Sequence, residues 1–147
     1  MRLSTKGRYG TRAMLDVALH SKNGLVHLRD VAERQEISKK YLEHLVARLE
    51  ADGLLRTVRG AGGGVALTRP PSETTILDIL HSLEGSLVPV ECVDRPEVCS
   101  RAVDCSARDL WTELGGVMTE FLASVTLEDL CERQIEKDKP AALTYSI

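Results

Sequence analysis

The sequence contains few aromatic residues, with one Trp, one Phe and three Tyr among 147 positions. Surfaces that bind single-stranded nucleic acid stack the bases on aromatic rings, so this scarcity argues against such a surface. No apolar stretch of about 18 residues occurs, so we expect no membrane-spanning helix. The opening MRLSTKGRYG lacks the apolar core of a signal peptide, which predicts a cytoplasmic protein.

Catalytic motifs are also missing. No pairing of a nucleophile with a base can be found, and the segment GAGGG lacks the Lys and Ser/Thr that complete a phosphate-binding P-loop. Closely spaced cysteine pairs, which are typical of structural zinc sites, do not occur either. We therefore predict that the protein is not an enzyme and has no small-molecule substrate.

Charge is divided unevenly along the chain, although the formal net charge is only −3. Residues 1–70 hold 13 Lys/Arg and 7 Asp/Glu, whereas residues 71–147 hold 6 and 15. The front half is thus basic, at +6, and the back half is acidic, at −9. Such asymmetry is typical of a nucleic-acid-binding part joined to a part with another role.

Residues 38–70 carry the strongest structural signal. Ser38 is a candidate N-cap, and Gly53 a candidate C-terminal stop, for a helix with two unlike faces. One face is apolar and the other is polar and basic: Leu42, Leu45, Val46 and Leu49 against Lys39, Lys40, Glu43, His44 and Arg48. The segments LLRTVR and VALTR then predict two strands joined by a GAGGG turn. This arrangement suits double-stranded DNA, with the helix in the major groove and the hairpin on the backbone or in the minor groove.

Two further helices are predicted before this one. Residues 4–21 have apolar residues at helical spacing, and residues 27–36 predict a short second helix with Ile37 buried in the turn that follows. A basic cluster at the start of the chain could contact phosphate: Arg2, Lys6, Arg8 and Arg12. Two short helices joined by so tight a turn predict a helix-turn-helix, and the hairpin makes it a winged helix over residues 1–71.

Beyond the hairpin, the pattern predicts a bridge and then a loop. Ser72 would cap a bridging helix over residues 72–86, and Gly85 would end it. Residues 87–109 form a loop by composition, because Pro and Asp residues interrupt any regular pattern. Three of the four cysteines lie in this loop with the spacing C-x6-C-x5-C: Cys92, Cys99 and Cys105.

A long helix follows the loop. Apolar residues recur at helical spacing from about residue 106 to residue 125. A helix of that length spans roughly 30 Å, which is too long for a small domain to bury alone. Gly115 and Gly116 would let a partner backbone approach closely. We therefore expect a homodimer, with dimerisation helices over residues 106–137 and a loose tail over residues 138–147. The predicted fold is mainly α: a winged helix-turn-helix domain plus a long dimerisation helix.

Several roles for the three loop cysteines are open from their spacing alone. In a cytoplasmic protein, clustered cysteines more often bind metal or act in redox chemistry than form structural disulfides. An iron–sulfur cluster tolerates this wide spacing, while zinc, a thiol–disulfide switch and no role at all are the alternatives. The fourth cysteine, Cys131, falls on the apolar stripe of a last helix that starts at Thr126, and we assign it to packing.

Three stretches of the chain resemble a known family. They are the opening MRLSTKGRYGTRAMLDVALH, the helix ISKKYLEHLVARLEADGLL and the hairpin VRGAGGGVALTR. They are similar to the IscR-type family of bacterial winged-helix iron–sulfur regulators, whose relatives include NsrR and CymR. The similarity extends over residues 1–137. It implies a homodimer of winged-helix domains joined through the long helix.

The resemblance also implies site residues. The loop cysteines correspond to those that hold an iron–sulfur cluster in cluster-binding members: Cys92, Cys99 and Cys105. The implied DNA-binding residues lie on the recognition helix and the hairpin: Ser38, Lys39, Lys40, Tyr41, Glu43, His44, Arg59 and Gly60. Among them, Glu43 suits the amino group of cytosine and Arg59 suits a narrow minor groove.

Two departures from the family leave the fourth cluster ligand open. Family members offer a His three residues after the third cysteine, or a carboxylate near the N-terminus, where this sequence has Arg108 and Arg8. The other candidates are Asp104, Asp109, Glu113, a water or a small thiol. The first cysteine gap is also one residue longer than in the IscR type. We favour a two-iron two-sulfur (2Fe-2S) cluster over a four-iron four-sulfur (4Fe-4S) one.

The predicted function is a sequence-specific DNA-binding transcription regulator. The cluster would control operator binding, and so sense iron–sulfur status, redox state or nitric oxide, by setting the separation of the two recognition helices. One alternative is a cluster-free winged-helix repressor that uses thiol oxidation or a partner protein as its signal. An alternative of another class is a small iron–sulfur carrier protein.

Overall fold

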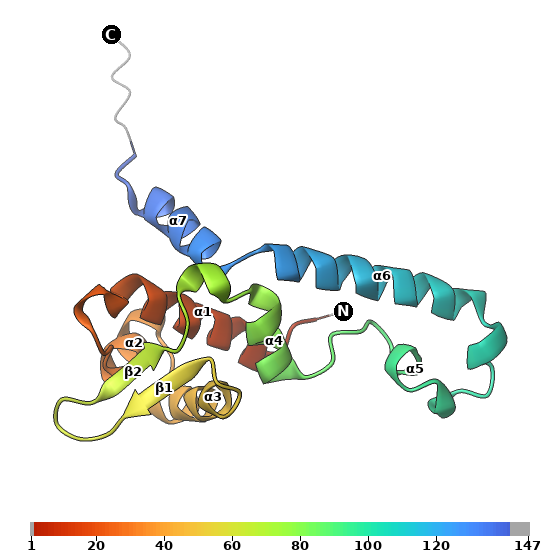
Figure 1. Cartoon of the computed structure of the whole chain (residues 1–147), viewed down its shortest axis with the longest axis horizontal. Helices are drawn as coiled ribbons and strands as arrows, with labels where there is room; N and C mark the ends of the chain where they lie inside the picture. The colour runs from red at the N-terminus through yellow and green to blue at the C-terminus, as the bar shows by residue number, and fades with distance from the viewer. Residues whose placement is uncertain (1, 142–147) are drawn as a thin grey trace, which may run out of the picture.

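The computed structural model describes residues 2–141, and these residues are mostly helical, as predicted (Figure 1). The helices and strands run in this order: α1 Thr5–His20, α2 Leu28–Gln35, α3 Lys39–Ala51, β1 Leu55–Val58, β2 Gly64–Leu67, α4 Ile76–Glu84, α5 Glu91–Asp94, α6 Ser106–Ser124 and α7 Leu127–Asp138. Within this part of the chain, no helix is long and apolar enough to cross a membrane.

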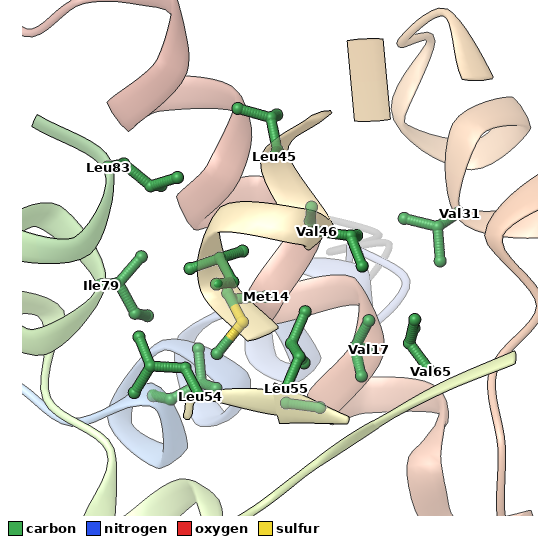
Figure 2. Close-up of a cluster of buried hydrophobic side chains, with 14 of the residues drawn as sticks. Met14, Val17, Val31, Leu45, Val46, Leu54, Leu55, Val65, Ile79 and Leu83 are labelled. Atoms are coloured by element: carbon green, nitrogen blue, oxygen red, sulfur yellow. The ribbon is translucent and has the colours of Figure 1, made fainter. Parts of the chain in front are cut away.

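Most elements gather at one end of the molecule. Figure 1 shows α1 to α4, the β1–β2 hairpin and α7 packed together, which we call the compact domain, while α6 extends away from it. The core of the compact domain lies between α1, α3, α4 and the hairpin (Figure 2). Its fully buried side chains include Met14, Leu42, Leu49, Ile79 and Leu127.

The predicted helix-turn-helix is confirmed. The Ser38 hydroxyl accepts a hydrogen bond from the Tyr41 amide at 3.2 Å, so Ser38 caps α3 as expected. Gly53 has a φ of 76° and follows the C-cap of α3, again as expected. Between α2 and α3, Glu36 adopts the left-handed conformation and Ile37 is buried, so the turn is tight and closed by an apolar side chain.

The hairpin is shorter and better anchored than the sequence indicates. β1 and β2 pair antiparallel over four residues each, with Leu55 opposite Leu67 and Val58 opposite Gly64. Val26, in the connection before α2, exchanges two backbone hydrogen bonds with Val65, at 2.8 and 2.9 Å. A Cβ atom at Gly64 would lie 2.5 Å from the Val26 carbonyl oxygen, so only glycine permits this approach.

The start of α4 corrects one prediction. Ser72 lies in a short 3-10 turn, Pro71–Glu73, and does not cap the helix. The cap is Thr75: its hydroxyl accepts from the Asp78 amide at 3.1 Å, and the Asp78 carboxylate accepts from the Thr75 amide at 3.0 Å. This reciprocal pair satisfies two backbone amides that would otherwise lack partners. Ser72 has no acidic partner at the corresponding place, so it cannot form such a pair.

The end of α6 is fastened to the start of α4. The Ile76 amide donates to the Val125 carbonyl at 2.9 Å, and the Leu127 amide donates to the Thr74 carbonyl at 2.8 Å. Thr126, predicted to start the last helix, is the N-cap of α7, with a second capping box in which two hydrogen bonds to Thr126 lower the pKa of Asp129. Helix α7, grouped with the dimerisation helices by sequence, packs against α1 and places Leu127 in the core. The tail was predicted over residues 138–147; Asp138 instead ends α7, and residues 142–147 lie outside the described part of the chain.

The start of α1 is fastened to the end of α4. The Glu84 carboxylate accepts from the Ser4 hydroxyl at 2.6 Å and from the Ser4 and Gly7 amides at 3.0 and 3.1 Å. A carboxylate is favourable at this place, because the amides of a helix N-terminus carry partial positive charge. A Cβ atom on Gly7 would lie 2.4 Å from the bonded carboxylate oxygen. Glycine at this position therefore leaves room for the contact.

Gly7→Ala should destabilise the fold by forcing Glu84 away from α1. Loss of hydrogen bonds to a charged group costs about 1.5–3 kcal/mol, and the better helix propensity of alanine offsets roughly 1 kcal/mol. We expect the free energy of unfolding, measured by urea denaturation, to fall by up to about 2 kcal/mol. Gly62→Ala is the control, because its Cβ would meet no atom within 4 Å. Equal stability of the two variants would contradict this role of Gly7.

Candidate nucleic-acid interface and cysteine segment

The N-terminal half of α3 presents the predicted DNA-binding side chains to solvent. Ser38, Lys39, Lys40, Glu43 and His44 are all exposed, while the opposite side of the helix is buried in the core. The structure therefore brings these predicted residues together on one accessible face. Lys39 and Glu43 lie 3.8 Å apart as an exposed ion pair, which contributes little stability and leaves both side chains free to turn toward another partner.

Tyr41 differs from its neighbours because it is only partly exposed. Its ring meets the Tyr9 ring edge-on, with 6.1 Å between centroids and 80° between planes. The guanidinium groups of Arg8 and Arg12 lie 5.8 and 5.4 Å from the centroid of the Tyr9 ring. The basic start of α1, assigned to phosphate by sequence, is thus held beside the recognition helix by aromatic contacts that the sequence does not reveal.

An ion pair with a buried carboxylate fixes α2 against α1. Asp16 is 1% exposed, and its carboxylate accepts from Arg34 Nη2 at 2.6 Å, from Arg34 Nε at 3.0 Å and from Gln35 Nε2 at 2.8 Å. The hydrogen bonds to Asp16 raise the pKa of Arg34. Because α2 and α3 are joined by a tight turn, this pair also helps to orient α3. No sequence signal singled out Asp16.

Arg48 lies on the polar side of α3 but takes part in internal contacts. Its Nε donates to the Ser82 carbonyl of α4 at 2.8 Å, and it pairs with Asp52 at 3.3 Å. A cavity of about 440 Å³ beside it is lined partly by Lys6, Tyr41 and Arg48. The structure therefore assigns Arg48 to the joint between α3 and α4, next to the recognition face.

The hairpin carries Arg59 at its tip. Arg59 directly follows β1 and is exposed, and Gly60 next to it has a φ of 104°, a conformation that favours glycine. Figure 1 shows the hairpin beside α3, so the tip and the recognition helix belong to the same end of the compact domain. The geometry suits simultaneous contact with adjacent grooves of a duplex.

Residues 87–105, which we call the cysteine segment, connect α4 to α6. Cys92 lies on α5, Cys99 ends a 3-10 turn and Cys105 is the residue before α6. All three thiols are free; Cys92 and Cys105 are partly buried and Cys99 is exposed. The segment has no continuous helix or strand, as predicted, although short helical turns shape it.

The thiols are not gathered around a point in this structure. Across residues 2–141, no three His, Cys, Asp or Glu side chains are close enough to hold a metal ion. Asp104, Asp109 and Glu113 are therefore not brought together with the cysteines as ligands either. Arg108, at the position where a fourth ligand is sought, instead donates from Nε to the Cys92 carbonyl at 2.8 Å.

Cys131 has a different environment from the other three cysteines. It is partly buried and packs against the core from α7, which confirms its assignment to packing. Burial raises the pKa of its thiol, and the nearby Glu128 and Glu132 raise it further. Cys131 is therefore a poor source of thiolate at neutral pH.

Helix α6 has two apolar stripes with different surroundings. The inner stripe is partly covered by the protein itself and comprises Trp111, Met118 and Leu122, and the buried Val125 follows the helix. The outer stripe is largely open, with Leu110 55%, Val117 63% and Phe121 61% exposed, and the partly buried Leu114 lies between them. Gly115 was expected to face a partner, but its Cβ would lie 3.3 Å from Pro89 of the same chain. Gly116 meets no atom within 4 Å.

Comparison with known proteins identifies the family. The model of the Rrf2 family, described as iron-dependent transcriptional regulators, matches residues 3–133. The chain belongs to the Rrf2 family. It is 44% identical over 134 residues to the HTH-type transcriptional regulator IscR of Photorhabdus laumondii, covering 91% of this chain and 81% of that protein.

Two solved structures have the same fold. IscR of T. potens superimposes with a TM-score of 0.79 at 36% identity, covering 99% of this chain and 97% of the other. CymR, the global cysteine regulator of B. subtilis, gives a TM-score of 0.75 at 37% identity, covering 90% and 98%. These similarities confirm the predicted winged helix-turn-helix fold and the resemblance to the IscR type. The chain is a DNA-binding transcription regulator of the Rrf2 family, and the prediction that it is not an enzyme is confirmed.

Arg59→Ala should weaken DNA binding and reduce its salt dependence. Each arginine that engages the DNA backbone releases counterions, so its loss should lower the slope of log affinity against log salt by about one unit per site. The slope is measured by fluorescence anisotropy on a duplex selected from random sequences. Arg133→Ala removes an exposed arginine from α7 and serves as the control. An unchanged slope for the Arg59 variant would mean that the hairpin tip does not engage DNA.

Proposed function

We propose that this Rrf2-family regulator binds its operator as a homodimer under the control of an iron–sulfur cluster held by Cys92, Cys99 and Cys105. The observation that carries the proposal is that three free thiols lie in the segment directly before α6, within a chain whose family is described as iron-dependent. The proposal places the protein in the cytoplasm, with its DNA.

The donor set of the cysteine segment fits an iron–sulfur cluster. Thiolates are the usual ligands of such clusters, and these three are neither paired in disulfides nor deeply buried. Cluster binding would gather them from α5, from the turn before residue 100 and from the start of α6. When bound, the cluster supplies a redox-active and oxygen-labile group. The fourth ligand would come from Asp104, Asp109, Glu113, a water or a small thiol, and we favour a 2Fe-2S cluster.

The outer stripe of α6 supports the homodimer. Leu110, Leu114, Val117 and Phe121 are spaced by four, three and four residues, the spacing that pairs two helices along a coiled-coil seam. An exposed apolar stripe of this length marks an interaction surface, because large apolar side chains rarely line up in water. We propose that α6 of a second copy occupies this surface, because the outer stripe of each copy is then covered by the same stripe of the other.

The regulatory step would act through the ends of the cysteine segment. The segment begins three residues after Glu84, which holds the first turn of α1, and it ends at α6, which would form the dimer seam. Ordering the segment would therefore change the angle between α6 and the compact domain. In a dimer, that angle sets the distance between recognition helices, and half-sites on DNA tolerate only certain distances. A coupling of about 1–3 kcal/mol would change operator affinity roughly 5- to 150-fold.

Cluster removal is the test of this function. Anaerobically purified protein should contain iron and acid-labile sulfide, and chelation should change its affinity for the selected duplex by the factor given above. Cys92→Ala should lose the visible absorbance, whereas Cys131→Ala should keep it. Absence of iron with intact DNA binding would favour thiol oxidation or a partner protein as the signal. Iron without sequence-dependent DNA binding would favour a carrier protein.

The dimer has its own test. Val117→Glu places a charge in the middle of the outer stripe and should give a monomer by light scattering coupled to gel filtration. Val103→Glu, at a side chain that is 92% exposed on the cysteine segment, should leave the dimer intact. If Val117→Glu has the same mass in solution as the unmodified protein, α6 is not the seam.

A further inference from the structure

Arg108 connects two parts of the cysteine segment that are far apart in sequence. It lies in the first turn of α6, three residues after Cys105. Its Nε donates to the Cys92 carbonyl oxygen at 2.8 Å, and its Nη2 reaches the Val93 carbonyl oxygen at 3.4 Å. One side chain thus holds the main chain of the first loop cysteine to the helix that starts beside the third.

The bonded carbonyls belong to a helix that needs outside partners. Helix α5 has only four residues, Glu91–Asp94, and the Arg95 amide closes it with a hydrogen bond to the Glu91 carbonyl. The last carbonyls of any helix lack partners within it, so those of Cys92 and Val93 depend on donors from elsewhere. Arg108 supplies two such donors, and it is itself only partly exposed.

The chemistry of arginine excludes it as a ligand and suits it as a tether. A guanidinium is cationic at every accessible pH and carries only donors, so it offers iron no lone pair. Its planar fork can bind two acceptors in a fixed relative position. The acidic side chains of α5 have other partners: Glu91 pairs with Arg95, and Asp94 accepts from Ser86. The contact of Arg108 is therefore with the backbone and depends on its fork shape as well as its charge.

We propose that Arg108 is a positioning residue, which holds the backbone at Cys92 against the start of α6 and so prearranges Cys92 and Cys105 for the cluster. The inference depends on the proposed cluster site. A site that is partly arranged before binding loses less conformational freedom when it binds, and so retains its ligand for longer. The same tether joins α5 to the proposed dimer helix, so it also couples the cluster to that helix.

Hydrogen–deuterium exchange on the cluster-free protein tests the tether without any metal. In Arg108→Gln, the amides of residues 91–95 should exchange roughly 2- to 10-fold faster, the factor expected for loss of one net hydrogen bond. Arg101→Gln is the matched control: it removes the same charge from an exposed arginine in the same segment. Arg108→Lys keeps the charge and loses the fork, so it should resemble Arg108→Gln more than the unmodified protein. Equal exchange in the two glutamine variants would overturn the tether.

The rate of cluster loss tests the positioning role. With excess chelator under anaerobic conditions, visible absorbance should decay roughly 2- to 10-fold faster in Arg108→Gln than in Arg101→Gln. Faster exchange without faster cluster loss would overturn the proposal, because the tether would then be structural only. Unmodified protein without iron would defeat the cluster site itself, and the exchange result would still report on the tether. Circular dichroism verifies that each variant retains its helices.

Discussion

The structure depends on α4 being held at both ends. At its start, backbone hydrogen bonds join residues 74–76 to residues 125–127; at its end, Glu84 binds the first turn of α1. The cysteine segment and α6 leave α4 at one end and return to it at the other, so they form a closed path. Because neither end of that path is free, a conformational change within it acts on α4. Helix α4 in turn contacts both α1 and α3. The helix that the sequence predicts as a bridge therefore connects the cysteine segment and α6 to α1 and α3.

The proposed DNA-binding face is held in place by contacts between helices. The carboxylate of Asp16 is nearly inaccessible to water, whereas the Arg34 side chain is 35% exposed, so removing Arg34 would leave a buried charge without its cationic partner, which is unfavourable. The Tyr9–Tyr41 contact and the two arginines beside Tyr9 connect α1 directly to the recognition helix. In the proposed homodimer, we therefore expect the distance between recognition helices to change by rotation of whole domains about α6, with the proposed recognition face itself unchanged.

Local signals predicted most of the fold. The sequence identified the cap Ser38, the stop Gly53 and, to within one residue, the start of the last helix at Thr126, because helix ends depend on neighbours a few residues away. The helical spacings were equally local. Ser72 was wrong because Thr75 offers the same hydroxyl together with an acidic partner three residues on. The sequence could not reveal the bridge between Val26 and Val65, because that pairing depends on how distant segments fold back.

The candidate site likewise has features that the sequence predicts and features that only the fold reveals. The recognition residues follow from one helix with two faces, and the structure places them together on the exposed side of α3. Gly115 could not be interpreted from the sequence in the same way, because a small residue permits a close approach without indicating which segment approaches it. In the structure that segment contains Pro89. The position of Arg108 identified it as a departure from the family pattern. Only the folded chain shows which atoms its guanidinium meets.

Burial of Leu127 has a consequence for fragments of the protein. This side chain is fully enclosed in the core, and its helix, α7, packs against α1. A fragment that ends before residue 127 would therefore have a gap in the core of the compact domain, and such a gap is destabilising. The winged helix thus depends for its stability on a helix that lies outside it in the sequence.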